Sequence, residues 1–305
     1  MRVAVVFPGQ GTQVPGMGAP WTSHPAWKII ESAEAALGEP LAPLLLDAPA
    51  EQLARTRDAQ LAVLCTSLIA WEAASAYVDD VVAFAGHSLG QVTALIASGV
   101  LSLEDGVRFA ARRAELTQAA ADAHPGKMAA LLGASIEDAE AACAAAPDAC
   151  WVANENAPGQ VVIAGTPDGL AAASARAKEL GIKRAMPLNV GGAFHTPLMA
   201  SARDGLRDAL TSVTLEPPRA PIVSNHDGAA YDDADGWHDR LPEHVTVPVR
   251  WRTSMETLVA LGADAFVEVG TGSMIAGVAK RTVPGTPVEP CGSPSECDRL
   301  AEVLL

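Results

Sequence analysis

Short apolar runs and longer stretches with helical apolar spacing alternate along the first part of the chain. Val3–Phe7 and residues 81–85 are uninterrupted apolar runs, which predicts short strands buried on both faces. Residues 59–77, AQLAVLCTSLIAWEAASAY, have helical apolar spacing and predict a core helix. Residues 90–100 predict a short helix directly after the second strand. Strands that alternate with helices in this way indicate an α/β domain with a parallel sheet.

The pattern changes after the break at residues 124–126, His-Pro-Gly. Residues 127–190 read in order as strand, helix, two strands around an Asn-Ala-Pro-Gly turn, helix and strand. This βαββαβ order is that of a ferredoxin-like unit. Helix and strand patterns then resume, so we expect a discontinuous α/β core over residues 1–125 and 191–305. Residues 126–190 would form a small subdomain inserted into that core.

Composition narrows the classes of partner. The chain has 305 residues, 49% of them hydrophobic, and a formal net charge of -15. Nucleic acids and anionic membranes need a cationic face, so neither is expected as the main partner. The N-terminal apolar run is too short for a signal peptide or a membrane span, and no later run is long enough to cross a bilayer.

The number and spacing of the cysteines do not indicate a disulfide framework or a metal site. Five are present, an odd number, and no two of them have CxxC spacing. A disulfide framework and a zinc site are therefore not expected, and a reducing cytoplasm is the compartment that fits best.

The stretch GHSLG places Ser88 between Gly86 and Gly90, where the second predicted strand meets the next helix. The G-x-S-x-G pattern in that context is typical of a nucleophile elbow, a tight turn that lifts the hydroxyl out of the backbone. The N–H groups at the following helix N-terminus can stabilise an oxyanion. The alternative is a glycine-rich turn whose serine caps the helix. The strand before and the helix after favour a nucleophile, and we expect His87 to face away from the site as a structural residue.

A nucleophilic serine needs a base within hydrogen-bond reach, and His195 is the candidate. Thr196 and Pro197 predict a helix start directly after it, which puts the histidine at the same rim of the sheet as Ser88. A nearby helix N-terminus keeps the imidazole neutral and able to accept a proton. The alternative is a histidine packed under a loop. The other histidines are expected at the surface or at the break between subdomains: His24, His124, His226, His238 and His244.

Two more residues suggest parts of a site. The stretch FPGQGTQ places Gln10 after the first strand, where the loop either donates a second backbone N–H to an oxyanion or forms a simple tight turn. Arg113 stacks over Phe109 and beside Leu116, on the less polar side of its predicted helix. An arginine there needs a fixed partner, either a carboxylate bound through two hydrogen bonds or an internal salt bridge.

The chain lacks two features of an α/β-hydrolase esterase. In that class the histidine follows the acid near the C-terminus, whereas His195 lies well before the end of this chain. No HGGG-type oxyanion loop is present. A serine–histidine dyad with an arginine and without an acid is a different design.

Six motifs, in this order along nearly the whole chain, resemble those of malonyl-CoA:acyl-carrier-protein transacylases: FPGQGTQ, GHSLGQ, RRAELTQ, NENAPGQVVIAG, GGAFHTPLM and VPVRW. The resemblance implies an α/β-hydrolase-like core with a short parallel sheet and a ferredoxin-like insert. It implies that Ser88 is acylated and that His195 is the general base and acid. It further implies oxyanion N–H groups from Gln10 and Leu89, and a malonate carboxylate bound by Arg113.

The resemblance also assigns supporting roles. It implies that a main-chain carbonyl near Arg250 orients His195 in place of a triad acid, and that Asn156 of the insert lines the substrate cleft. Phe194 precedes the histidine; in related polyketide acyltransferases phenylalanine there accompanies malonyl and serine accompanies methylmalonyl. The ring leaves no room for a branch at the acyl Cα. Gln91 stands where glutamate is common in such families.

The implied activity is ping-pong transfer of malonyl from coenzyme A to the phosphopantetheine thiol of an acyl carrier protein, in fatty-acid or polyketide synthesis, with no cofactor or metal. Two alternatives stay open: a trans-acting polyketide acyltransferase for another acyl unit, and a thioesterase that uses the same dyad. Because the carrier is expected to be acidic, docking needs a local basic patch. The candidates, which are otherwise ordinary solvated charges on an expected monomer, are Lys183, Arg184, Lys280 and Arg281.

Overall fold

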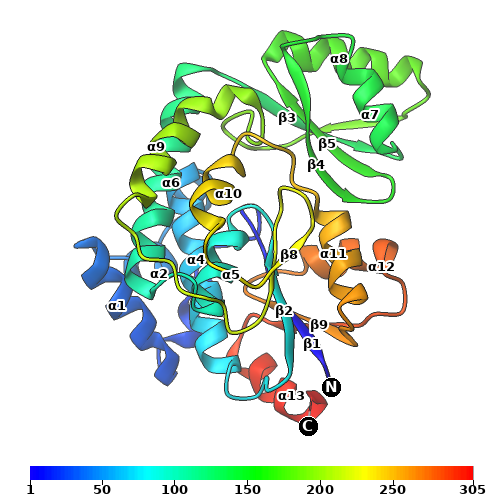
Figure 1. Cartoon of the computed structure of the whole chain (residues 1–305). Coiled ribbons are helices and arrows are strands. Elements are labelled where there is room, and N and C mark those ends of the chain that lie inside the picture. Colours follow the sequence, from blue (N-terminus) through cyan, green and yellow to red (C-terminus); the bar gives the residue numbers. More distant parts are fainter. Residues whose placement is uncertain (305) are drawn as a thin grey trace.

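A six-stranded sheet forms the centre of the larger part of the molecule. The computed structural model describes residues 1–304, and the strand order of this sheet is β10-β9-β1-β2-β7-β8 (Figure 1). All neighbouring strands are parallel except β8, which runs antiparallel to β7. The expected parallel sheet is therefore confirmed, with one antiparallel edge strand. The strands are β1 (Val3–Phe7), β2 (Val81–Gly86), β7 (Ile222–Val223), β8 (Ala230–Tyr231), β9 (Ala265–Val269) and β10 (Val288–Cys291).

Helices cover both faces of this sheet, as the uniformly apolar strands require. Successive side chains of a strand point to opposite faces. In β1, Val3, Val5 and Phe7 accordingly pack into one apolar cluster, and Ala4 and Val6 into another. The first cluster contains residues of α1 (Lys28–Leu37), α4 (Thr56–Ala74), α5 (Gly90–Ser98), α6 (Leu103–Ala123), α9 (Ala200–Leu210), α10 (Trp237–Glu243) and α13 (Pro294–Leu304). The second contains residues of α11 (Trp251–Ala260) and α12 (Met274–Thr282).

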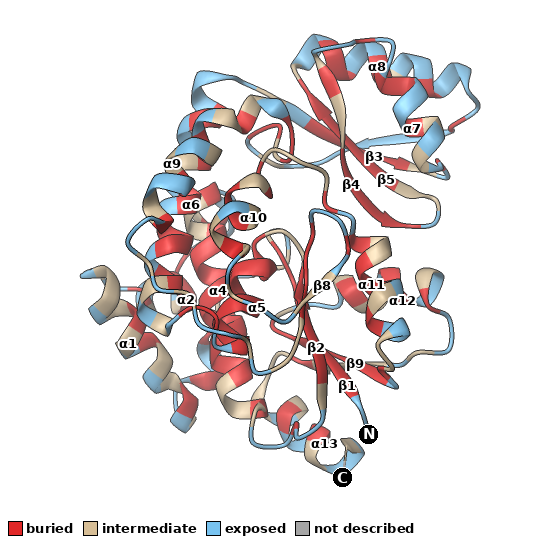
Figure 2. Cartoon of the chain, in the orientation of Figure 1, coloured by how far each residue is buried: buried red, intermediate tan, exposed pale blue. Residues whose placement is uncertain are grey.

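A second, antiparallel sheet carries the inserted part of the chain. The element order is the predicted βαββαβ, and the strand order is β4-β5-β3-β6. These elements have their own apolar core, which includes Leu131, Ile163 and Ala173, and both helices leave their outer sides exposed (Figure 2). The elements are β3 (Lys127–Leu132), α7 (Ile136–Cys143), β4 (Cys150–Ala157), β5 (Gln160–Gly165), α8 (Pro167–Glu179) and β6 (Arg184–Pro187). The short helices α2 (Ala42–Leu46) and α3 (Ala50–Leu53) belong to the larger part.

Strand β4 joins the insert to the larger part. The Glu155 N–H donates to the Val249 carbonyl at 2.9 Å, and the Val249 N–H donates to the Ala153 carbonyl at 2.9 Å. Arg252 also forms an ion pair with Glu155 at 3.4 Å. The segment 244–250 of the larger part is thus hydrogen-bonded to the insert along β4, which matters for the site described below.

Three further observations concern the cysteines, the possible metal ligands and the helix lengths of the described residues. All five cysteines are free and buried, and burial raises the pKa of the Cys65 thiol to about 12. Within residues 1–304, no group of three or more His, Cys, Asp or Glu side chains is arranged to hold a metal ion. None of the helices in that range is both long and apolar enough to span a membrane.

Candidate active site

Ser88 lies in a strained turn between β2 and α5. Its φ is 53°, a left-handed backbone conformation that non-glycine residues adopt rarely and that clusters at functional sites. Both flanking glycines are required by close packing. A Cβ on Gly86 would lie 1.9 Å from the Gly90 carbonyl oxygen, and a Cβ on Gly90 would lie 2.3 Å from that of Phe7. The turn therefore has the geometry of a nucleophile elbow rather than of an ordinary helix cap.

His195 is in contact with Ser88, although 107 positions separate them in the sequence. The Ser88 Oγ and the His195 Nε2 are 2.8 Å apart, and the histidine is 4% exposed. The His195 Nδ1 lies 2.7 Å from the His244 carbonyl oxygen, which only accepts hydrogen bonds. The Nδ1–H therefore donates to this carbonyl, and the Nε2 lone pair is left to accept the proton of the serine hydroxyl. Two expectations from the sequence, the rim position and the pairing with Ser88, agree with this geometry.

The carbonyl that orients His195 is not the predicted one. The Arg250 carbonyl lies at the start of α11 and accepts hydrogen bonds from the Ser254 N–H at 3.0 Å and the Ser254 hydroxyl at 2.9 Å. It is already used as an N-terminal helix carbonyl, so it does not face the imidazole. His244, expected at the surface, is instead 3% exposed and supplies the carbonyl. The VPVRW motif points to Arg250, whereas the carbonyl that holds the imidazole belongs to His244, six positions earlier in the chain.

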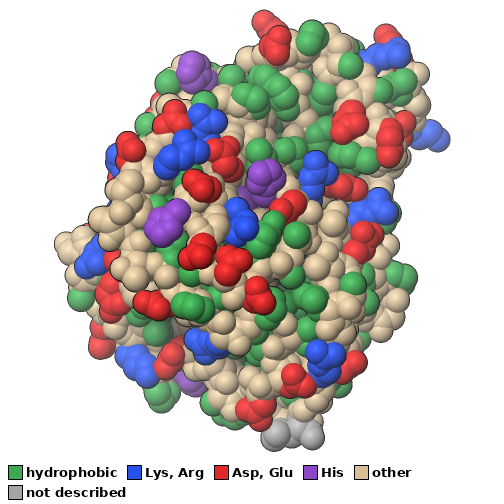
Figure 3. Space-filling model, viewed as in Figure 1, with side chains coloured by type: hydrophobic (Ala, Val, Ile, Leu, Met, Phe, Trp, Pro, Cys, Tyr) green, Lys and Arg blue, Asp and Glu red, His purple; other side chains and the backbone are tan. Residues whose placement is uncertain are grey.

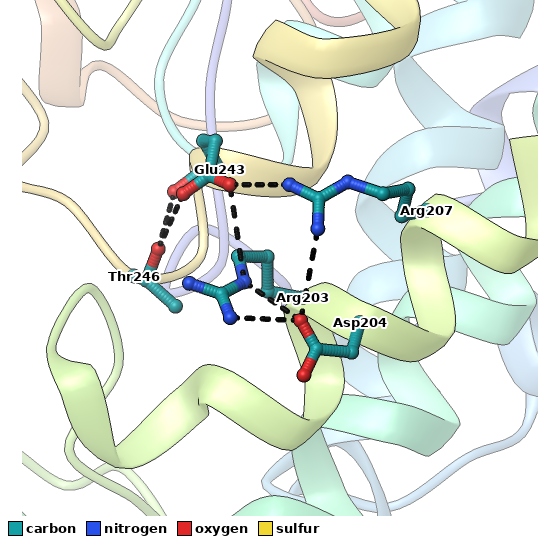
Figure 4. Close-up of polar contacts among 5 residues, drawn as sticks. All are labelled: Arg203, Asp204, Arg207, Glu243 and Thr246. Atoms are coloured by element: carbon teal, nitrogen blue, oxygen red, sulfur yellow. Dashed lines mark hydrogen bonds and ion pairs between the residues drawn. The ribbon is translucent and has the colours of Figure 1, made fainter.

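A network of charged residues anchors the loop that carries the His244 carbonyl (Figure 4). Glu243, the last residue of α10, accepts hydrogen bonds from Arg207 of α9 at 2.7 Å and from the Thr246 hydroxyl at 3.3 Å. Asp204 of α9 pairs with Arg207 at 3.8 Å and with Arg203 at 2.8 Å. Helix α9 follows His195 in the chain and α10 precedes His244, so the network ties together the two segments that meet at the imidazole.

Burial keeps His195 neutral. Desolvation and, second, the charge of Arg113 lower the pKa of His195 to about 3. The imidazole is therefore a free base at all pH values near neutrality, which is the form that can accept a proton from Ser88.

This pKa predicts an unusual pH dependence. Between about pH 8 and pH 5, the acylation rate of Ser88 should stay nearly constant, without the inflection near 6.5 that an ordinary histidine base produces. The free energy of unfolding, unlike the acylation rate, should change over this pH range. A histidine with a depressed folded pKa stabilises the fold above its unfolded value of about 6.5, and this contribution is lost as the pH falls toward 3. Denaturant titrations should show a lower free energy of unfolding at pH 5 than at pH 7, and a smaller difference in His195→Gln. An inflection in the acylation rate near pH 6.5 would contradict the assignment.

Arg113 faces the same serine from α6. It is 6% exposed, and its guanidinium donates to the Gln60 side-chain oxygen at 2.6 Å and to the Ser88 Oγ at 3.2 Å. Burial lowers its pKa to about 10, so the group is still charged at neutral pH. Within residues 1–304 no carboxylate pairs with it, so the internal salt bridge weighed as an alternative is not formed. A buried cation held by a neutral amide is costly unless a ligand supplies the negative charge.

A cavity of about 190 Å³ between the two parts of the molecule contains these groups. Ser88, His195 and Arg113 form its polar end, and Gln10 lines it as well. The walls are largely apolar and come from both parts: Met128, Val162, Leu188, Val190, Phe194 and Met274. Phe194 therefore lines the same cavity as Ser88 and His195, and its effect on the acyl group stays a prediction.

The insert contributes an amide cluster to this cavity. The Asn156 Oδ1 lies 2.9 Å from the His87 Nε2, and the Asn154 Nδ2 lies 3.4 Å from the same nitrogen. His87 also packs edge-on against Trp251, with ring centroids 5.5 Å apart. Asn156 lines the cavity as expected, but the expectation that His87 faces away from the site is wrong, because it lines the same cavity and holds the insert's amides.

Two backbone donors near Ser88 are free. The Ser88 N–H is taken by Asn225 at 2.7 Å and the His87 N–H by the Phe7 carbonyl at 2.9 Å. By contrast, the N–H groups of Gln10 and Leu89 donate to no atom of the residues that the structure describes. Leu89 stands at the start of α5, where the helix dipole adds positive potential. Both groups are available for an oxyanion.

Sequence reasoning missed three buried polar residues at this site. They are Gln60, which holds Arg113, and Ser224 and Asn225 at the end of β7. Gln60 is a polar residue within an otherwise apolar helix pattern, and that interruption was the available signal. Nothing in the local pattern marks the other two. Gln91, the position that departs from the common glutamate, is fully buried and accepts a hydrogen bond from the Asn225 N–H at 3.0 Å.

The four basic residues considered for docking lie at two places. Lys183 and Arg184 are exposed at the start of β6, the edge strand of the insert. Lys280 and Arg281 are exposed in the last turn of α12, and Arg281 hydrogen-bonds Gln160 in the hairpin turn of the insert. On the face in Figure 3 acidic and basic side chains are mixed, so any docking patch for an acidic partner has to be local.

A strained serine, a buried neutral histidine and an arginine that pairs with no acid in residues 1–304 lie in one cavity, an arrangement suited to acyl transfer. The family model described as "Acyl transferase domain" matches residues 4–293, and the chain belongs to this family. The relatives that it matches include malonyl CoA-acyl carrier protein transacylases. That of Bacillus subtilis is 36% identical over 287 residues, which cover 92% of this chain and 90% of that protein. That of Salmonella typhimurium is 37% identical over 289 residues, 92% and 93% of the two chains.

Solved structures agree with this assignment. The acyl-carrier-protein S-malonyltransferase of Burkholderia pseudomallei superposes with a TM-score of 0.94 at 34% identity, over 99% of this chain and 100% of that one. A malonyl-transacylase solved in complex with its type II polyketide synthase acyl-carrier protein superposes with a TM-score of 0.95 at 31% identity, over 99% and 100% of the two chains. The mixed α/β architecture, a parallel sheet with a small antiparallel sheet, is thus that of the family.

Proposed function

We propose that this protein transfers a malonyl group from malonyl-CoA to the phosphopantetheine thiol of an acyl carrier protein. The observation that carries the proposal is Arg113, a buried guanidinium that pairs with no carboxylate of residues 1–304 and lies 3.2 Å from the Ser88 Oγ. A malonyl ester on Ser88 would place its free carboxylate within reach of this group. The names of the relatives point to the same acyl group.

The first half-reaction acylates Ser88. His195 Nε2 takes the hydroxyl proton while the Ser88 Oγ attacks the thioester carbonyl of malonyl-CoA. The N–H groups of Gln10 and Leu89 stabilise the oxyanion that forms, and the His244 carbonyl stabilises the imidazolium through Nδ1–H. When the carbon–sulfur bond breaks, the coenzyme A sulfur leaves with the proton from His195, and malonyl remains on the serine.

The second half-reaction reverses these steps with another thiol. The phosphopantetheine thiol of the carrier gives its proton to His195, and its sulfur attacks the ester carbonyl on Ser88. Collapse of the second oxyanion breaks the bond to the Ser88 Oγ, which regains the proton from the imidazole. Malonyl leaves as a thioester of the carrier, and the enzyme returns to its starting state. None of these steps requires a cofactor, and independence from one is a prediction.

The proposal also includes a finer description of the two parts of the fold. The strand–elbow–helix unit β2–Ser88–α5 supports an α/β-hydrolase-like core, and the strand order β4-β5-β3-β6 supports a ferredoxin-like insert. The antiparallel sheet, which runs from Lys127 to Pro187, supports limits of 126–190 for the insert. A monomer in the cytoplasm stays a prediction.

One experiment separates transfer from the thioesterase alternative. Protein carrying malonyl on Ser88 is freed of malonyl-CoA and divided between buffer and buffer with holo carrier protein. The proposal expects slow loss in buffer and rapid loss with the carrier, matched by malonylated carrier in the mass spectrum. Equally rapid loss in both would favour a thioesterase. A parallel arm with larger carboxylated acyl-CoA donors tests the trans-acting alternative.

Phe194 should limit the acyl group at its α-carbon. The ring lines the cavity beside Ser88, so Phe194→Ser is expected to raise acylation by methylmalonyl-CoA about 10-fold relative to malonyl-CoA, since one methylene is worth roughly 1–3 kcal/mol in an apolar pocket. Competition between the two donors, read by intact-protein mass spectrometry, measures the ratio. An unchanged ratio would mean that another wall of the cavity excludes the branch.

The four exposed basic residues considered for docking should affect only the second half-reaction. Replacing both Lys280 and Arg281 by glutamate is expected to raise the KM for the carrier protein about 10-fold at low salt. The same result is expected when both Lys183 and Arg184 are replaced by glutamate. Acylation by malonyl-CoA should not change. The matched control is the double charge reversal of Arg176 and Lys178 to glutamate, both exposed on α8 at the side of the insert away from the larger part (Figure 1). An equal rise in the control would show a net-charge effect, and no rise in either pair would remove both patches from docking.

A further inference from the structure

The strained backbone of Ser88 is held by one side chain from the loop that follows β7. The Asn225 Oδ1 accepts a hydrogen bond from the Ser88 N–H at 2.7 Å, and its Nδ2 donates to the Gly86 carbonyl at 2.8 Å. One carboxamide thus spans both sides of the elbow. A left-handed non-glycine residue persists only where its surroundings determine its conformation, and these two bonds supply that constraint.

Asn225 is itself fixed on every side. It is 1% exposed, and its backbone N–H donates to the Gln91 side chain of α5 at 3.0 Å. Its carbonyl accepts the Arg250 N–H at 2.9 Å, which ties it to the segment 244–250. All four of its polar groups are therefore used, two on the elbow and two on the elements that flank it. A side chain with this many fixed contacts has no rotamer freedom to lose when the substrate binds.

Ser224, the residue before Asn225, is linked through His244 to His195, the other member of the dyad. Ser224 is fully buried, and its Oγ is hydrogen-bonded to the His244 Nε2 at 3.1 Å. The carbonyl of that same His244 holds the His195 Nδ1 at 2.7 Å. The dipeptide Ser224-Asn225 is consequently joined to Ser88 through one residue and to His195 through the other.

We infer that Ser224 and Asn225 are positioning residues that fix Ser88 and His195 relative to each other for acyl transfer. They touch neither the acyl group nor a reacting atom. Their effect runs through the backbone of the elbow and through the His244 carbonyl. The inference rests on the proposed reaction at Ser88. It explains what holds the Ser88 hydroxyl and the His195 imidazole 2.8 Å apart.

Asn225→Asp is the sharpest variant. The carboxylate still accepts the Ser88 N–H, but it cannot donate to the Gly86 carbonyl and repels it instead. The acylation rate per active site should fall about 100-fold, the cost of misplacing a reacting group by roughly 1 Å. Protonation of the aspartate restores a donor, so the rate of this variant should recover as the pH falls from 8 to about 5, while the wild-type rate stays flat over the same range.

The rate is read by rapid quench and intact-protein mass spectrometry, with the amplitude giving the fraction of competent sites. The titratable and charged groups near this region are His87, His195, His226, His244, Arg113 and Arg240, and the wild-type pH profile accounts for them. Loss of stability alone lowers the amplitude and the melting temperature without changing the rate per site. It also gives no recovery on acidification.

Two further variants keep the test decisive if Asn225→Asp does not fold. Ser224→Ala removes the bond to His244 and should lower the rate per site about 3- to 10-fold with an unchanged KM, as expected for a lost bond of about 1 kcal/mol. Ser98→Ala, equally buried at the far end of α5, removes a hydroxyl bonded to the Leu95 carbonyl and should leave the rate unchanged. Wild-type rates per site in both Asn225→Asp and Ser224→Ala would overturn the inference. A wild-type protein that forms no adduct at Ser88 would instead overturn the proposed function.

Discussion

His195→Ala is expected to lower the single-turnover acylation rate of Ser88 by about 10³-fold, within the range that positioned acid–base groups contribute. The imidazole is the base in contact with the hydroxyl, its Nε2 lying 2.8 Å from the Ser88 Oγ. Its neutrality follows from burial, and its orientation follows from the His244 carbonyl. Loss of this group leaves the hydroxyl with its ordinary, high pKa and with Arg113 as its remaining close polar partner.

The measurement is rapid-quench mass spectrometry with malonyl-CoA in excess. His124→Ala is the control, since His124 is exposed at the end of α6 and lies outside the cavity. Circular dichroism and melting temperature establish that the variants fold. A His195→Ala protein that acylates within about 3-fold of the wild-type rate would mean that another group, or water, removes the proton.

Arg113→Ala is expected to lower acylation by malonyl-CoA about 100- to 1,000-fold, the range found for removing one partner of a buried charge pair. Acylation by acetyl-CoA should stay the same or rise. In the wild-type protein an acetyl group gives the buried guanidinium no negative partner and leaves it to neutral ones such as Gln60, and that cost disappears with the arginine. The ratio of the two rates is therefore the informative quantity.

Arg113→Lys serves as the matched variant. Lysine keeps the charge but has a single ammonium in place of the planar fork, so an intermediate loss for malonyl is expected. Equal losses for malonyl and acetyl in Arg113→Ala would contradict the carboxylate role. They would indicate that the guanidinium acts through its 3.2 Å contact with the Ser88 Oγ instead.

Features that depend on short stretches of sequence were predictable. The apolar runs of β1 and β2 and the G-x-S-x-G pattern around Ser88 are local signals that indicate buried strands and a tight turn, although the space at Gly90 is limited by Phe7 of β1. The βαββαβ order of the insert follows from the same local periodicities. His195 could be placed at the rim because the helix start at Thr196 is also a local signal.

Features that depend on how distant loops meet were not predictable. His244 lies in a polar stretch that suggests a surface residue, yet the ion pairs of Glu243 and the hydrogen bonds of Val249 to β4 fold that loop over the imidazole. The His-orienting carbonyl was therefore assigned to Arg250, next to a recognisable motif. His87 was misjudged for a related reason, since its partner Asn156 comes from the insert, 69 positions away.

The central claim is that Ser88 carries malonyl as a covalent intermediate selected by its carboxylate. The most direct measurement is brief mixing of the protein with an equimolar blend of malonyl-CoA and acetyl-CoA, followed by acid quench, intact-mass analysis and mapping of the modified peptide. The expected result is one malonyl adduct on the peptide that contains Ser88, with little acetyl adduct, and neither in Ser88→Ala. An adduct that persists in Ser88→Ala, or acetyl and malonyl adducts in equal amounts, would contradict the claim.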